Sequence, residues 1–568
     1  MERRSLSHRR LPSDPEFDRF PGPSRAATRS DGPSSQPSPS NEFTVPKTIE
    51  PEYVEGFKLA ALLASVTVVV FLMMLDTSIL ATAIPRITDE FESLEDVGWY
   101  AAIYQLASAA LQPLTGKIYQ KFSTQWTFIT FFAIFEIGSA ICGASVASWM
   151  LITGRAIAGI GGAGLINGAL TILGTSVSMS RRPTYTGIMM GFSQLGIIAG
   201  PLVGGAFTSY VSWRWCFYIN LPIGALVIVA LSFVHIPDAF QKRRAMDVLR
   251  RIYIELDLLG FALLAPAAVQ LMLALSWGGD KYPWNSPIII GLFSGAGATT
   301  IVFLVWDWYL GDVALVPLSL VTQRQVWTSA ITNCFLLFII YVASFFLPIY
   351  FQAVHGATPI MSGVYVMASI VSQLILAVIV GPLVQKTGYV IPYTIFSASI
   401  GAVSNGLCST FSPTTPPVQY ILYQILGGIG RGAGMQMPLL AIQAILPPQD
   451  IAMGTCILVF VQNLGISILL AGANTIFGET LQNELSQAVP YSREILQAGA
   501  TRFREVVKEG DLDVVLEAWS RSIGKVFYMA AAAGGVAVFT ALGMGWVDIR
   551  KGKAGGRGRG PEGDLEDD

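Results

Sequence analysis

The hexapeptide Gly116-Lys-Ile-Tyr-Gln-Lys121 ends one long apolar run, and Gly381-Pro-Leu-Val-Gln-Lys386 ends another. Both follow the pattern Gly-x-aliphatic-x-Gln-Lys, and their first residues, 116 and 381, are 265 positions apart. Two further motifs recur in the same order at spacings of 268 to 269: Gly159-Ile-Gly161 with Gly428-Ile-Gly430, and Gln194-Leu-Gly-Ile197 with Gln462-Asn-Leu-Gly-Ile466. The shared order and spacing predict a chain built from two related halves.

The composition around these motifs is that of a membrane protein. The 568-residue chain is 52% hydrophobic and only 13% charged, whereas soluble proteins carry about 25% charged residues. An ordinary soluble enzyme is therefore excluded. The formal net charge of −2 provides no basic surface, so we expect no nucleic-acid partner. The five cysteines lie in apolar runs without a CxxC pair, so we expect neither a disulfide framework nor a metal site.

Apolar runs of about 20 residues, long enough to cross a bilayer as helices, recur along the chain. We predict fourteen such spans: 59–80, 97–115, 126–146, 149–172, 184–207, 215–236, 257–276, 287–306, 327–351, 360–383, 391–410, 419–443, 452–477 and 524–547. The repeat pairs the first six with the last six and leaves the seventh and eighth as an insert. We therefore predict an all-α integral membrane protein with two six-helix bundles and two inserted helices.

Basic residues set the orientation of the spans, because cytosolic loops are enriched in Lys and Arg. The short even-numbered loops contain eleven basic residues and the short odd-numbered loops three, so we expect the even loops and both termini in the cytosol. We predict two cytosolic tails, a disordered one at 1–57 and another at 549–568. The first bundle is predicted at 58–236, and the second at 325–548 with an extracellular loop at 478–523. A cytosolic linker and the two inserted helices are predicted between the bundles, at 237–324.

Five stretches carry a resemblance to a known family. They are Leu75-Asp76-Thr-Ser-Ile-Leu-Ala-Thr-Ala-Ile-Pro85, Gly154-Arg155-Ala-Ile-Ala-Gly159-Ile-Gly-Gly-Ala-Gly164, Gly196-Ile-Ile-Ala-Gly200-Pro201-Leu-Val-Gly204-Gly205, Trp213-Arg-Trp-Cys-Phe-Tyr-Ile-Asn-Leu-Pro-Ile-Gly224 and Leu347-Pro-Ile-Tyr-Phe-Gln-Ala353. Together they resemble the major facilitator superfamily, and within it the fourteen-span drug–proton antiporters. The Ser/Pro-rich tail and the 478–523 loop resemble fungal members that export toxins or secondary metabolites. The resemblance implies the major facilitator fold.

Three ionisable residues within the spans are candidates for proton coupling. Asp76 and Glu136 are intramembrane carboxylates, which are costly to bury and are functional candidates by default. Arg155 needs an anion, and either carboxylate is available as its partner; the resemblance implies that this arginine takes part in proton coupling. The alternative is that these residues have a purely structural role, as an ion pair or as hydrogen-bond anchors.

Other polar residues in the spans are candidates for lining a substrate cavity: Gln105, Asn167, Gln352, Gln424, Arg431 and Gln436. A proline inside a helix removes a backbone hydrogen bond and kinks the helix. We therefore predict a kink at Gly200-Pro201, with gating by Gly196, Gly200, Pro201, Gly204 and Gly205, a motif that the resemblance links to antiporters. In Gly116–Lys121 the family pattern has an acidic residue where Gln120 stands, so this chain departs from the charge relay that usually holds the cytosolic gate in the family.

These features predict a proton-driven exporter of a small apolar or amphipathic organic molecule, such as a toxin, drug or secondary metabolite. The alternatives are uptake of a siderophore or nutrient by the same fold, and a membrane sensor without transport. The motifs HExxH and GxSxG of membrane enzymes are missing from the sequence, so we expect no enzyme. We expect a proton gradient in place of a cofactor, a lipid bilayer as surroundings, a monomer, and the plasma membrane as location, with a vacuolar or vesicle membrane as the alternative.

The topology generates a first prediction. Tags at both ends should be accessible only from the cytosol, and a protease site inserted in 478–523 should be cut only from outside, because the basic residues concentrate in the even loops. Protease treatment of intact and permeabilised cells measures both. Cleavage of the loop site from the cytosolic side alone would contradict this topology.

Overall fold

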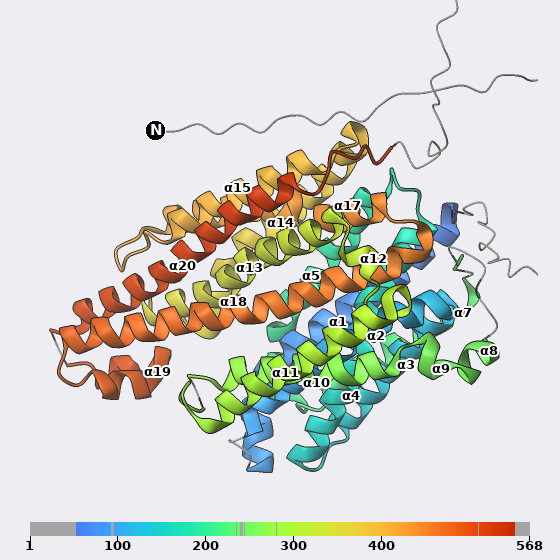
Figure 1. The fold of residues 1–568 in the computed structure, drawn as a ribbon. Helices are drawn as coiled ribbons and strands as arrows, with labels where there is room; N and C mark the ends of the chain where they lie inside the picture. The colour runs from blue at the N-terminus through green and yellow to red at the C-terminus, as the bar shows by residue number, and fades with distance from the viewer. Residues whose placement is uncertain are drawn as a thin grey trace, which may run out of the picture. The chain divides into compact units, whose positions relative to one another are not determined.

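The computed structural model describes residues 53–92, 96–234, 236–238, 242, 245–279, 281–508 and 510–550 (Figure 1). Most of the two predicted tails, 1–52 and 551–568, lies outside these described residues. The described chain is helical, and its only extended pairing is a single bridge between Gly278 and Tyr282. This architecture agrees with the predicted all-α class.

The helices follow the predicted spans. The first half contains α1 (Gly56–Phe91), α2 (Val97–Lys121), α3 (Thr124–Gly143), α4 (Ser148–Ser176), α5 (Arg182–Tyr210), α6 (Trp215–Tyr218) and α7 (Asn220–Phe233). The linker and insert contain α8 (Ala245–Arg250), α9 (Ile252–Glu255), α10 (Leu258–Trp277), α11 (Pro287–Leu310) and α12 (Leu318–Val321). The second half contains α13 (Arg324–Ala353), α14 (Pro359–Thr387), α15 (Ile391–Cys408), α16 (Pro417–Gly434), α17 (Met437–Ile445), α18 (Ile451–Ala488), α19 (Ser492–Val506) and α20 (Leu512–Leu542).

All fourteen predicted spans fall on helices, and several differ in detail; span 215–236, for example, is divided between α6 and α7. Span 419–443 is two helices, because α17 starts anew with Pro438 in its first turn, a position that suits proline. α18 continues to Ala488 and α20 begins at Leu512, so the loop predicted at 478–523 is shorter and contains α19. Among the described residues, eleven helical segments are long and apolar enough to cross a membrane; α2, α15 and α16 fall below that threshold.

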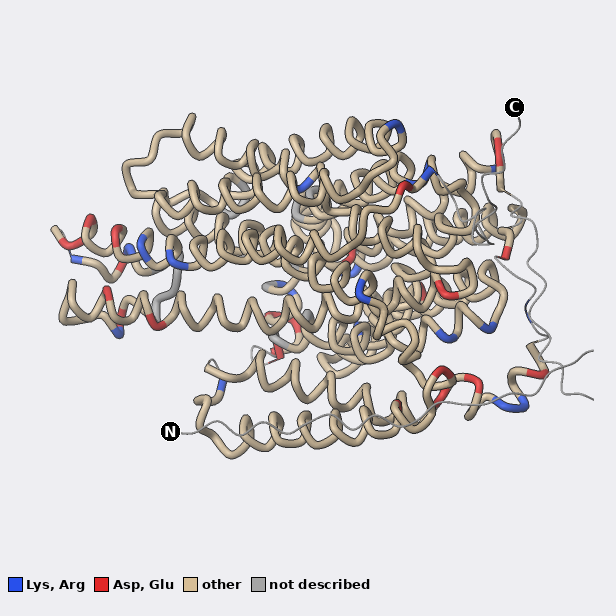
Figure 2. The backbone as a smooth tube through the Cα atoms, turned by 45° about the horizontal axis from the view of Figure 1, so that its top comes forward, with Lys and Arg blue, Asp and Glu red and all other residues tan. Residues whose placement is uncertain are grey.

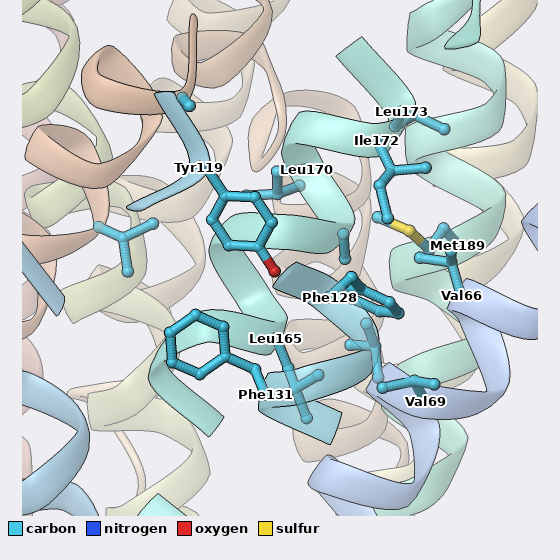
Figure 3. Close-up of a cluster of buried hydrophobic side chains, with 14 of the residues drawn as sticks. Val66, Val69, Tyr119, Phe128, Phe131, Leu165, Leu170, Ile172, Leu173 and Met189 are labelled. Carbon is cyan, nitrogen blue, oxygen red and sulfur yellow. The ribbon is translucent and has the colours of Figure 1, made fainter. Parts of the chain in front are cut away.

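The first half packs around α4. α3 and α2 contact α4, and α5 contacts α1. Figure 3 shows part of the core between them, to which α1 contributes Val66, α2 Tyr119, α3 Phe128 and α4 Leu165. In the second half α14 and α15 contact α16, and α20 contacts α13 and α15.

The two halves meet at two equivalent interfaces, α2 with α18 and α5 with α14. The repeated hexapeptides lie in them. A Cβ added at Gly116 would lie 2.9 Å from Cβ of Cys456 on α18, and one added at Gly381 would lie 2.7 Å from Cα of Thr184 on α5. Each repeated glycine therefore permits close approach to the opposite half. This placement agrees with the internal repeat detected in the sequence.

The inserted helices α10 and α11 pack against each other, and α10 also contacts α2 and α18 (Figure 1). Figure 2 shows long stretches of helix without charge, with Lys, Arg, Asp and Glu gathered mainly near helix ends and in connections. This distribution fits helices surrounded by lipid.

A prediction about packing follows from the glycines of α4. A Cβ added at Gly161 would lie 2.5 Å from the backbone nitrogen of Phe135, whereas Gly297 on α11 has nothing within 4 Å of such a Cβ. Gly161→Ala should therefore destabilise the protein by about 1–3 kcal/mol through overpacking. Gly297→Ala should be neutral or stabilise it by up to about 1 kcal/mol. Thermal unfolding in detergent compares the two variants, and equal melting temperatures would contradict the packing.

Candidate functional site

A buried ion pair joins α1 to α4. Arg155 Nη1 donates to Asp76 Oδ2 at 2.5 Å, and the side chains of the two residues are 2% and 0% exposed. The guanidinium also donates from Nε to the carbonyl oxygen of Tyr100 at 3.2 Å, and its Cζ lies 4.7 Å from the ring centroid of Tyr104. Of the two anions that the sequence offered to Arg155, the structure thus selects Asp76.

Glycines on α4 make this arrangement possible. A Cβ added at Gly159 would lie 2.3 Å from the carbonyl oxygen of Tyr104, and one at Gly162 would lie 2.4 Å from its hydroxyl oxygen. The close approach of α2 to α4 brings the aromatic ring over the guanidinium, where its quadrupole attracts the cation. Tyr100 and Tyr104 were not among the predicted site residues, although their spacing of four residues on one helix puts them on the same face.

The predicted gating motif on α5 packs against the segment of α1 that carries Asp76. Cβ atoms added at Gly196, Gly200 and Gly204 would lie 2.6 Å from Phe71 O, 2.5 Å from Ser78 Oγ and 2.2 Å from Thr82 Oγ1 respectively. A Cβ at Gly205 would meet nothing within 4 Å, so that glycine takes no part in the contact. α5 is helical through position 201, and the side chain of Pro201 lies outside the described residues.

Glu136 occupies a different interface, between α3 and α7. It is 7% exposed, and neither carboxylate oxygen has a hydrogen-bond partner among the described residues. A Cβ added at Gly224 would lie 2.2 Å from Oε1, so the carboxyl group lies against the backbone of α7. One turn away, Asn220 Nδ2 donates to Ser139 Oγ at 3.2 Å. Burial without a donor is costly for an ionised carboxylate, which keeps Glu136 a candidate for protonation.

Three of the six predicted cavity residues line a cavity, and the other three do not. Gln105 lines an open cavity, and Arg431 and Gln436 line a small one of about 20 Å³ between α5, α14 and α16. The other three donate hydrogen bonds within their own bundles. Asn167 donates to Thr115 Oγ1 at 3.0 Å, Gln352 to Ser362 Oγ at 3.0 Å, and Gln424 to Tyr420 O of its own helix at 3.2 Å.

Contacts between the halves close the ends that lead into the even loops. Cys456 Sγ donates to the carbonyl oxygen of Gln112 at 2.7 Å, and Gln120 Nε2 donates to Asp450 Oδ1 at 3.3 Å. The interface of α5 with α14 adds a hydrogen bond from Thr184 to Gln385 at 3.4 Å. Gln120, the departure from the family pattern, thus makes an amide–carboxylate bond across the interface.

Residues at the start of the Trp213–Gly224 segment connect helix ends of the first half on the side that leads into the odd loops. Trp213 Nε1 donates to Glu90 Oε2 at 2.7 Å, and Arg214 Nη2 donates to Glu90 Oε1 at 2.8 Å and to Ser145 O at 2.9 Å. The hydrogen bonds from Arg214, and then from Trp213, hold the pKa of Glu90 below its ordinary value. This contact joins the end of α1 to the segment before α6.

Two related helical bundles, closed against each other at one end and holding a buried ion pair, define a membrane transporter. Residues 66–470 match the model of the Major Facilitator Superfamily. The chain is 51% identical over 500 residues to the MFS-type transporter pigP of Monascus ruber, with 88% of each chain covered. It is 45% identical to the efflux pump mlcE of Penicillium citrinum, covering 90% of this chain and 96% of the other. The chain belongs to the major facilitator superfamily and is a multi-pass membrane transporter.

Solved structures show the same fold at low sequence identity. The human organic anion transporter MFSD10 superposes with a TM-score of 0.55 at 12% identity, covering 86% of this chain and all of that one. The proton:xylose symporter XylE superposes with a TM-score of 0.52 at 14% identity, covering 86% and 99%. The fold predicted from the sequence is confirmed.

The ion pair generates a prediction about stability. Arg155→Ala should cost about 3–5 kcal/mol, because it leaves Asp76 charged and unpaired in the bundle. Arg155→Lys should be milder, since the charge remains while the forked geometry is lost. Adding Asp76→Asn to Arg155→Ala should recover part of the loss, because the orphaned charge is removed. Thermal unfolding of the purified variants measures this cycle, and strictly additive effects would show that the pair is not coupled.

Proposed function

We propose that the chain is a proton-coupled exporter of a small apolar or amphipathic organic molecule. The observation that carries this proposal is the Asp76–Arg155 pair, buried in the half where the glycines of α5 pack against the same segment of α1. A charged pair in a bilayer helix bundle is expensive and is retained where it serves a function.

A proton bound by Asp76 would neutralise the carboxylate and weaken its attraction to Arg155. α1 and α5 would then be freer to move against α4, which alternating access between two facing states requires. When the carboxylate loses its proton, the ion pair forms again. The cost of burying an unpaired guanidinium would thus couple the protonation of Asp76 to the helix arrangement.

Export as the direction of transport rests on the relatives. The name of the Penicillium citrinum protein describes an efflux pump, as does that of a relative in Trichophyton rubrum, which is 39% identical over 504 residues. Siderophore or nutrient uptake and a sensor role are the alternatives. We propose the plasma membrane as location, ahead of a vacuolar or vesicle membrane, a monomer as the working unit, and a proton gradient in place of a cofactor.

Everted membrane vesicles with an imposed proton gradient test the proposal. Asp76→Asn keeps the size of the side chain and its hydrogen bonding but cannot ionise. We expect normal membrane abundance, retained substrate binding and loss of uphill, proton-driven accumulation in the vesicles.

Glu136→Gln is the matched control, since it makes the same change at the other buried carboxyl group. If Asp76→Asn still concentrates substrate with an unchanged pH dependence while Glu136→Gln does not, the proton site is Glu136 and Asp76 is structural. Downhill transport by the wild type that ignores the proton gradient would refute proton coupling altogether.

A further inference from the structure

We propose that the inserted helix α10 and its connection to α11 form a wall of the substrate site, in a cavity that accepts neutral or cationic organic molecules and disfavours anions. The inference rests on the proposed transport function and adds to it a location and a substrate class.

The cavity lies between the two halves, at the ends that lead into the odd loops. Its volume is about 830 Å³, within the range of about 300–1,000 Å³ that small-molecule sites occupy. α2 contributes Gln105 and α18 contributes Asn474 and Gln482. The insert contributes α10 residues and the connection to α11, including Ser276 and Trp284. One side of the cavity therefore exists only because the insert is present.

The lining defines the kind of molecule that fits. Trp284, Phe345 and Phe477 offer aromatic surface, and Gln105, Asn474 and Gln482 offer amide donors and acceptors. The single charge among the described lining residues is the carboxylate of Glu479, and none of these lining residues is Lys or Arg. Aromatic faces and a carboxylate attract cations, and an anion would meet no compensating charge. An apolar body with neutral polar groups or one positive charge matches this surface.

Three contacts fix the insert to α2. Lys121 Nζ lies 2.5 Å from Glu255 Oε2, immediately before α10. Lys117 Nζ donates to the carbonyl oxygen of Val313, just beyond α11, at 3.0 Å. At the other end the rings of Trp99 and Trp277 meet edge to face at 5.6 Å. The two lysines of the first repeated hexapeptide are thus attached to the insert rather than to a gate.

The contact of the insert with α18 is of a different kind. α10 packs on α18, and Phe460 of α18 adds an apolar side chain to the cluster that surrounds Leu264 and Phe303 of the insert. Apolar packing is not directional, so it allows sliding more readily than ion pairs and hydrogen bonds do. The insert is therefore expected to move with the first half, and the cavity to change volume as α2 and α10 move relative to α18.

A filling substitution tests the site without disturbing a packed core. Ser276 is exposed in the cavity, and Ser294 on α11 is exposed outside its lining. In everted vesicles we expect Ser276→Trp to slow export of the neutral dye Nile red by about tenfold or more, because the indole occupies the site. Ser294→Trp makes the same chemical change on the same insert and should stay within about twofold of the wild type. Equal rates for the two variants, in vesicles where the wild type exports, would overturn the proposal.

A binding measurement separates this inference from the proposed transport function. The five native cysteines are buried, so Ser276→Cys offers one accessible thiol for a membrane-impermeant methanethiosulfonate reagent in right-side-out vesicles. Nile red and the cation rhodamine 6G should slow its labelling, whereas the anion fluorescein should not. Protection without export would support the site while refuting export of the dye. Labelling that none of the dyes slows, or that fluorescein slows as much as the others, would overturn the site or its charge preference.

Discussion

The structure of the first half depends on neutralising one permanent charge. Arg155 cannot lose its proton in a protein, and it is 1% exposed within a bundle of apolar helices. Its carboxylate partner on α1, the carbonyl oxygen of Tyr100 and the ring of Tyr104 on α2 all satisfy the same guanidinium. The three helices must therefore approach closely, and the glycines of α4 and α5 remove the side chains that would keep them apart.

The second half repeats the helices but not the charges. With the spacings of the repeat, Ile339 stands where the first half has Asp76, and Gln424 stands where it has Arg155. Ile339 is 3% exposed, and Gln424 donates to its own helix at Tyr420. The fold thus tolerates neutral residues at these two positions of the repeat, which means that packing alone does not require the ion pair. That asymmetry favours a functional role for the charges and places the proposed proton chemistry in one half.

The sequence was sufficient to locate the helices, but it did not show which side of each helix faces the cavity, the bundle interior or the lipid. Apolar length located all fourteen spans, and the need of Arg155 for an anion restricted its partner to two carboxylates. A helix that is apolar all round gives no sign of its rotation, so Asn167 and Gln424 were predicted to line a cavity and instead bond within their own bundle. The partner of Gln120 was equally hidden, because Asp450 is 330 residues away along the chain.

The closed end between the halves is held without an ion pair among the contacts described across it. Gln120 and Asp450 form an amide–carboxylate bond at 3.3 Å, and the other described contacts involve amides, a thiol, a hydroxyl and closely packed glycines. A hydrogen bond between neutral groups contributes only about 1 kcal/mol, and one to a carboxylate about 1.5–3 kcal/mol. A transporter needs two states within a few kcal/mol of each other. Lys117 and Lys121, the basic residues of the hexapeptide that contains Gln120, are engaged by the insert. Proton binding would therefore act on the gate through the helices around Asp76 rather than through charges at the gate itself.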